Sequence, residues 1–127
     1  MYQALIALLL LTPVPAHAEP GCDYLDAFTP FDVQNGDNPV VMPNGRIVEL
    51  RASNTTKCAW GRISEATPAE EIWTDRTNLD GSGYEGFLGY IRVETGTGAH
   101  TEPFDNNGKL IRACGSSAGR IDCTGWF

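Results

Sequence analysis

One string in this sequence has the spacing of a catalytic serine, and it lies between two cysteines. Residues Gly115 to Gly119 read G-S-S-A-G, which matches the nucleophile elbow, where a strand enters the serine and a helix leaves it. The residues that follow, RIDCTGW, have the pattern of a strand, and Cys114 and Cys123 are nine positions apart. Across a loop of about four or five residues, that spacing can bring two cysteines within disulfide range. The string therefore predicts a disulfide-closed hairpin with serines in its turn, and no catalytic serine.

The chain has four cysteines in total, namely Cys22, Cys58, Cys114 and Cys123. An even number of cysteines in a small exported domain favours two disulfides over thiol chemistry. Zinc binding is disfavoured because the chain has no C-x-x-C, and His100 is not at a zinc-finger spacing from any cysteine pair. If Cys114 pairs with Cys123, Cys22 pairs with Cys58 by elimination, but four cysteines allow three pairings and the other two stay open.

Two other groups of residues could do chemistry. His100 lies two positions from Glu102, a spacing that puts both on one strand face, where a histidine and a carboxylate could act in general base catalysis. The segment around Asp75, Asp80 and Glu85 is rich in oxygen ligands, but it lacks the first acid and the final glutamate of an EF-hand loop. The two remaining interpretations are an irregular calcium loop and a glycine-rich hairpin connection. We expect no bound metal and no cofactor.

Residues 1–18 are predicted to be a secretory signal peptide. An apolar run from Ala4 to Leu11 is followed by the small-x-small triplet Ala16 to Ala18, as at a cleavage site. The run is too short to span a bilayer, so we expect a secreted, extracellular protein without membrane insertion. The net charge of −7 falls entirely on the following residues and disfavours nucleic acid or anionic lipid as partners.

The segments that contain these residues are predicted to be short strands. Residues 19–45 are rich in Asp, Pro and Gly and predict an irregular N-terminal arm, with a short strand at 40–42. Residues 46–127 form the predicted β-domain, with alternating or strand-like segments at 46–53, 58–64, 71–76, 86–94, 99–104, 109–114 and 120–126. About seven short strands predict an all-β, disulfide-stapled antiparallel sandwich or small barrel, which we expect to be monomeric.

The aromatic residues are the candidates for ligand contact. Trp60 shares a strand face with Cys58, and a large aromatic next to a disulfide commonly fills a sandwich core. Tyr84, Tyr90 and Trp126 are the more exposed candidates and could form a platform for a sugar or a protein.

The stretch ELRASNTTKCAWGRI resembles a signature of small secreted proteins of Streptomyces, related actinobacteria and Bacillus, grouped as a domain of unknown function. Its elements are a Leu-Arg strand at Leu50 and Arg51, a polar turn, then Cys58 and the Trp-x-Arg of Trp60 and Arg62. Members usually have a further cysteine in the arm. The resemblance implies a compact extracellular β-domain with disulfides and supplies no catalytic residues.

The sequence therefore predicts a secreted binding module that contacts an extracellular polymer or protein without catalysis. The alternatives are a small hydrolase using His100 with an acidic partner, and a secreted toxin or inhibitor.

Overall fold

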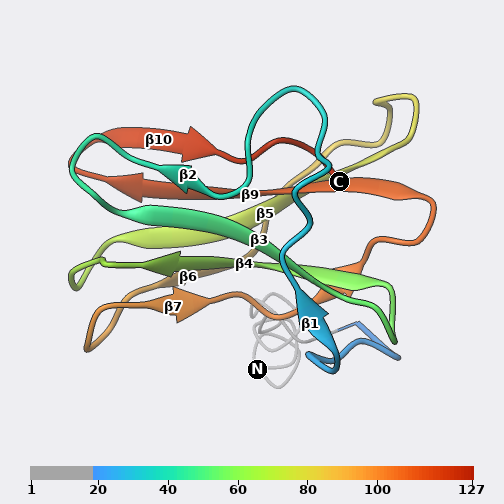
Figure 1. Cartoon of the computed structure of the whole chain (residues 1–127), viewed down its shortest axis with the longest axis horizontal. Coiled ribbons are helices and arrows are strands. Elements are labelled where there is room, and N and C mark those ends of the chain that lie inside the picture. Colours follow the sequence, from blue (N-terminus) through green and yellow to red (C-terminus); the bar gives the residue numbers. More distant parts are fainter. Residues whose placement is uncertain (1–18) are drawn as a thin grey trace, which may run out of the picture.

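The computed structural model describes residues 19–127, and the predicted signal peptide lies outside the described residues. Ten strands form two antiparallel sheets, and no helix occurs among residues 19–127 (Figure 1). The first sheet contains β1 (Ala27–Phe28), β2 (Val40–Val41), β3 (Ile47–Ser53), β4 (Cys58–Ser64), β7 (Ala99–His100) and β8 (Phe104–Asp105). The second contains β5 (Glu71–Asn78), β6 (Glu85–Arg92), β9 (Lys109–Ser117) and β10 (Arg120–Cys123).

The two sheets stack face to face, which confirms the predicted sandwich and excludes a closed barrel for the described residues. The first sheet has the order β1-β3-β4-β7, with β2 beside β3 and β8 beside β4, and the second has the order β10-β9-β5-β6. Apolar side chains from both sheets meet between them, including Val48, Leu50 and Ile63 from the first and Ile72 and Ile111 from the second, all fully buried. These residues alternate with outward-facing ones, as the two-residue period of a strand requires.

Two glycines let the sheets approach closely. A Cβ on Gly115 of β9 would lie 2.6 Å from Cγ2 of Val48 on the facing sheet. A Cβ on Gly61 of β4 would lie 3.2 Å from both the side chain of Ala113 and that of Ile72. Larger side chains at either position would push the layers apart, since interiors are packed without spare volume.

The predicted strands were found, with three differences in detail. The segment 99–104 is divided into β7 and β8 by a break at residues 101–103. The arm contributes β1 to the first sheet in addition to β2, the short strand predicted at 40–42. The hairpin of β9 and β10 turns through only two residues, Ala118 and Gly119, both with positive φ, which is the backbone of the favoured two-residue hairpin turns.

Trp60 is buried, as predicted, but it does not belong to the cluster between the two sheets. Trp60 is buried at 5 % exposure, but it pairs with Arg51 on the outward face of the first sheet and packs edge-on to Tyr24 of the arm at 4.9 Å. Trp73, at 4 % exposure, is likewise on the outward face of the second sheet, next to Cys114. Each sheet therefore has a buried tryptophan on its outer side.

Two disulfides have the predicted pairing, Cys22 with Cys58 and Cys114 with Cys123, and no cysteine is free among residues 19–127. Cys114 and Cys123 are directly opposite each other in the β9–β10 hairpin, with Cα atoms 4.0 Å apart. The other disulfide fastens the arm to the start of β4, with Cα atoms 5.7 Å apart. The G-x-S-x-G string is therefore the end of a hairpin, as predicted.

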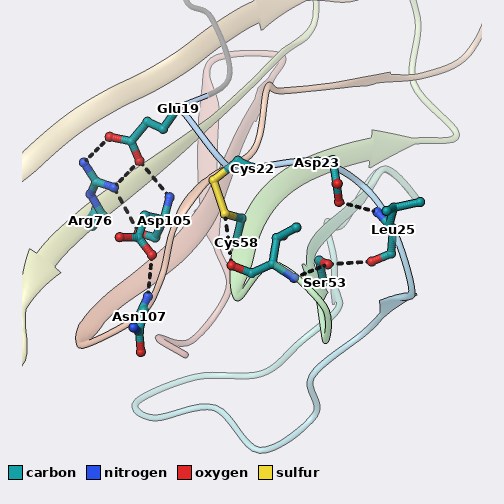
Figure 2. Close-up of a disulfide and its surroundings, with 10 residues drawn as sticks. Glu19, Cys22, Asp23, Leu25, Ser53, Cys58, Arg76, Asp105 and Asn107 are labelled. Carbon is teal, nitrogen blue, oxygen red and sulfur yellow. Dashed lines mark hydrogen bonds and ion pairs between the residues drawn. A yellow bond between two sulfur atoms is a disulfide. The ribbon is translucent and has the colours of Figure 1, made fainter.

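An ion-pair network holds the first residues of the arm beside the Cys22 to Cys58 disulfide (Figure 2). The Arg76 guanidinium, with its side chain only 8 % exposed, donates to the Glu19 carboxylate at 2.7 Å and to that of Glu85 at 2.8 Å. Glu19 also accepts a hydrogen bond from the backbone N–H of Asp105 at 2.7 Å. The hydrogen bonds from Arg76 lower the pKa of both glutamates below their ordinary value of 4.5.

This network predicts a loss of stability in acid. A carboxyl group whose pKa is lower in the folded state stabilises the fold above its unfolded pKa, and this contribution is lost as the pH falls through the folded pKa. We therefore expect the free energy of unfolding, measured with urea between about pH 7 and pH 3, to fall below pH 4.5. Glu19→Gln and Glu85→Gln should each reduce this pH dependence, whereas Asp32→Asn, at an exposed position, should leave it unchanged. Equal pH profiles for all four proteins would contradict the assignment.

Candidate binding surface

Three exposed aromatic side chains follow one another along β6 at every third residue. Tyr84, which immediately precedes β6, is 56 % exposed, Phe87 is 61 % exposed and Tyr90 is 42 % exposed. We call these three residues the aromatic row. It lies along the outward face of the second sheet at an edge strand, since β6 is the last strand in the order β10-β9-β5-β6.

Two β-bulges produce this spacing of three. Ile91 pairs with Ile72, Leu88 pairs with Thr74 and Glu85 pairs with Arg76, so three residues of β6 correspond to two residues of β5 at each step. A bulge puts two residues opposite one and thereby changes the side-chain alternation. As a result the aromatic row faces outward. Glu85, Leu88 and Ile91, which are also three residues apart, face the opposite side of β6.

The bulges depend on glycine and on an unusual phenylalanine. Gly89 has a φ of +67°, and a Cβ there would lie 2.8 Å from the Phe104 ring, so no other residue fits. Phe87 has a φ of +57°, a conformation that is strained for a bulky side chain. The backbone N–H of Phe87 donates to Oδ1 of Asp75 at 3.1 Å, which holds the residue in this conformation.

Trp73 of β5 supports two rings of the aromatic row. Its ring centroid is 4.8 Å from that of Phe87, with an interplanar angle of 30°, and 6.3 Å from that of Tyr90, with an angle of 29°. The Tyr90 hydroxyl donates to Glu71, and this hydrogen bond raises the pKa of the phenol. Both rings are therefore positioned before any ligand binds.

Asp75 fixes the third ring. This buried carboxylate, 3 % exposed, accepts a hydrogen bond from the Tyr84 hydroxyl at 2.6 Å and forms an ion pair with Arg112 at 3.0 Å. Burial and the hydrogen bond to Asp75 raise the pKa of the Tyr84 phenol, which therefore stays a neutral donor at pH 7. The Arg112 guanidinium also lies over the Trp126 ring, 4.6 Å from its centroid.

A shallow, open hollow of about 420 Å³ lies at the Tyr84 end of the aromatic row. Tyr84 and Trp126 form aromatic walls, with ring centroids 6.3 Å apart in a T-shaped arrangement. The other lining residues come from the arm and from the segments at the ends of β5 and β9, namely Gln34, Asn35, Thr77, Leu79, Asp80, Gly81 and Leu110. We call this the end hollow.

The structure brings the three candidate contact residues onto one face. Tyr84 and Tyr90 belong to the aromatic row, and Trp126, which is half-buried, lines the end hollow. The sequence pattern did not point to Phe87 as a contact residue. It also did not point to Trp73 as the ring that supports Phe87, or to Asp75 as the residue that anchors Tyr84. The sequence does contain a signal for Phe87, because residues 84–92 read YEG-FLG-YIR, with an aromatic residue at the start of each triplet.

The other candidate groups do not assemble into a site among residues 19–127. His100 is exposed on β7, where its Nδ1 lies 3.1 Å from the Thr101 carbonyl oxygen and its ring packs edge-on to Tyr24. No hydrogen bond joins it to a carboxylate or a hydroxyl of the described residues. Asp80 caps the β5–β6 turn, where its Oδ1 accepts hydrogen bonds from the backbone N–H and the hydroxyl of Ser82.

The metal-ligand atoms that gather most closely in the described part belong to Asp75, Cys114 and Cys123. Because these two cysteines form a disulfide, they provide no thiolate for a metal.

Comparison with known proteins gives no relative: no family model, curated protein or solved structure matches the chain. No helix among residues 19–127 is long and apolar enough to cross a membrane. The surface itself is therefore the basis for a functional proposal.

Proposed function

We propose that the protein is an extracellular, non-catalytic binding module whose contact surface is the aromatic row together with the end hollow. The observation that carries the proposal is the row itself: three aromatic side chains, each at least 42 % exposed, on one face along β6 and the residue before it. Contiguous exposed apolar surface on a small domain marks an interaction site.

The unusual backbone of β6 supports a functional role for this surface. Two bulges, a glycine with no room for a side chain and a phenylalanine at positive φ occur together where the three rings turn outward. Strain of this kind tends to occur at functional sites, where the surrounding structure holds it. A face without a role could use regular alternation with polar residues, as exposed strands usually do.

The rings are also ordered before binding. Tyr84 and Tyr90 each donate a hydrogen bond to a carboxylate, and Phe87 is packed on Trp73. Because side chains that are already fixed lose little conformational entropy, association with a partner costs less free energy. This property suits a binding surface, and the proposal includes no catalytic residue.

An extracellular location is consistent with the two disulfides, since such bonds persist in oxidising surroundings. The proposal adds that residues 1–18 act as a secretory signal peptide, as their apolar run and small-x-small triplet indicate.

Retention on insoluble extracellular material tests the proposal. The oxidised protein would be mixed with washed bacterial cell envelopes and with neutral and anionic polysaccharide particles, and its depletion from the supernatant measured. We expect retention on at least one material, reduced about tenfold in the Tyr84→Ala, Phe87→Ala, Tyr90→Ala triple variant. Phe31→Ala is the matched control, because it removes an aromatic ring that is 76 % exposed elsewhere on the arm.

Thermal unfolding of each variant establishes that it is folded before retention is compared. The proposal is wrong if the wild-type protein is retained by none of these materials. It is equally wrong if the folded triple variant is retained as well as Phe31→Ala.

A further inference from the structure

The orientation of the rings in the aromatic row indicates what kind of group they contact. Phe87 and Tyr90 are inclined by only 30° and 29° to Trp73, so the planes of the three rings are close to parallel, and Phe87 and Tyr90 are both exposed to solvent. The electron-rich face of an aromatic ring attracts polarised C–H groups. A pyranose sugar presents a flat face of such C–H groups, and its hydroxyls point outward around its rim.

The length of the row favours an extended ligand over a single small molecule. From the pairing of β6 with β5, Tyr90 lies at the level of Trp73, Phe87 at Asp75 and Tyr84 at Thr77. The distance from Trp73 to Thr77 is four residue steps of β5, which corresponds to roughly 13 Å along the strand. The row is therefore a line of contact sites of the kind that successive units of a linear polymer would occupy.

The charges at the row favour an uncharged polymer. Asp75 is paired with Arg112, and the Glu71 carboxylate accepts the Tyr90 hydroxyl. The whole chain has a net charge of −7, which would repel a polymer carrying carboxylate, phosphate or sulfate groups. A neutral polymer is not repelled by this charge. It also does not have to displace the ion pair of Asp75 with Arg112.

The end hollow supplies polar groups that the row itself lacks. Asp80, Gln34 and Asn35 line it together with the rings of Tyr84 and Trp126. Amide and carboxylate side chains offer both donors and acceptors, which match the neighbouring hydroxyls of a sugar. This combination of aromatic walls with a few polar groups is typical of a site that fixes the orientation of its ligand.

The geometry points to an uncharged, linear polysaccharide as the ligand, with its sugar rings stacked along Tyr84, Phe87 and Tyr90 and one sugar held in the end hollow. This inference rests on the proposed function and adds the chemical class of the ligand. A protein partner fits less well, because the two bulges interrupt the edge of β6 that would otherwise pair with another strand.

Calorimetry with defined oligosaccharides tests the inference on the oxidised protein. The probes are the neutral hexasaccharides of β-1,4-linked glucose, N-acetylglucosamine, mannose and xylose, with hexagalacturonate as the anionic comparison. We expect at least one neutral hexasaccharide to bind with a Kd of about 1 mM or tighter, and hexagalacturonate to bind at least about tenfold more weakly than that hexasaccharide.

Matched variants locate the binding. Tyr84→Ala, Phe87→Ala and Tyr90→Ala should each weaken the bound hexasaccharide by about tenfold. Tyr84→Phe keeps the ring and should stay within about threefold of the wild type, as should Phe31→Ala. Gln34→Ala should weaken binding by about threefold or more without changing thermal stability, because Gln34 is exposed and is one of the residues that line the hollow.

The outcomes separate this inference from the proposed function. Binding of none of the four neutral hexasaccharides, or equal binding of hexagalacturonate, overturns the polysaccharide assignment. If the protein is nevertheless retained on envelopes through the aromatic row, the proposed function stands with a protein or a charged polymer as partner. If retention is also absent, both are wrong.

Discussion

Replacing Asp75 with alanine is expected to lower the free energy of unfolding by about 3 kcal/mol. Removing one partner of a buried ion pair costs roughly 3 to 5 kcal/mol, and the lower value applies because the Arg112 side chain is 28 % exposed and can turn toward water. The change also removes the acceptor for the Tyr84 hydroxyl and for the backbone N–H of Phe87. Urea unfolding of the oxidised protein at neutral pH measures the effect.

Two variants make this prediction specific. Asp32→Ala removes an acid at an exposed position and should change stability by less than about 0.5 kcal/mol. Asp75→Asn keeps an acceptor oxygen and should be less destabilising than Asp75→Ala. Because Asp75 anchors the aromatic row, folded Asp75→Asn should also be retained less well on extracellular material. If Asp75→Ala is as stable as Asp32→Ala, the carboxylate does not hold this face together.

Removing the disulfide of the arm is the second change with a large expected effect. We expect the Cys22→Ser, Cys58→Ser double variant to lose about 4 kcal/mol of unfolding free energy, because the bond closes a long loop in the unfolded chain. The two cysteines are 36 positions apart in the sequence. The variant should also loosen the network of Glu19 with Arg76, which lies beside the disulfide (Figure 2).

The hairpin disulfide provides the matched comparison. Cys114 and Cys123 are nine positions apart, and chain entropy gives such a loop about 3 kcal/mol. The Cys114→Ser, Cys123→Ser double variant should therefore be the more stable of the two in urea unfolding. The opposite order would show that loop closure is not the main contribution of these bonds. Peptide mapping of the oxidised wild type should recover both linkages.

The strands could be predicted where the alternation of apolar and polar residues is regular. Residues 46–53 and 58–64 have the clearest alternation and form β3 and β4 almost to the residue. The even number of cysteines predicted two disulfides and the spacing of Cys114 and Cys123 favoured the pairing that was found, although the sequence left the other two pairings open. The location of Trp60 could not be predicted in this way. Alternation shows which residues of a strand share a face, but it does not show whether the arm covers that face.

The candidate site was only partly predictable for a related reason. Tyr84, Tyr90 and Trp126 could be selected as large aromatics outside the clear alternation, but Phe87 sits in a segment where the period changes from two to three. The two bulges that cause this change depend on Gly89 and on the bond from Phe87 to Asp75. Asp75 contacts residues from β6 and β9, a long-range arrangement that no local pattern shows.

Hydroxyl-radical footprinting tests the location of the binding surface most directly. The oxidised protein, free or bound to the material that retains it best, would be labelled and the labelling rate of each aromatic residue read by mass spectrometry. Tyr24 and Phe31, which are 39 % and 76 % exposed on the arm, are internal controls. The account predicts that binding slows labelling of Tyr84, Phe87 and Tyr90 about fivefold or more and leaves both arm residues unchanged. Protection of Tyr24 or Phe31, with the aromatic row labelled as in the free protein, would contradict it.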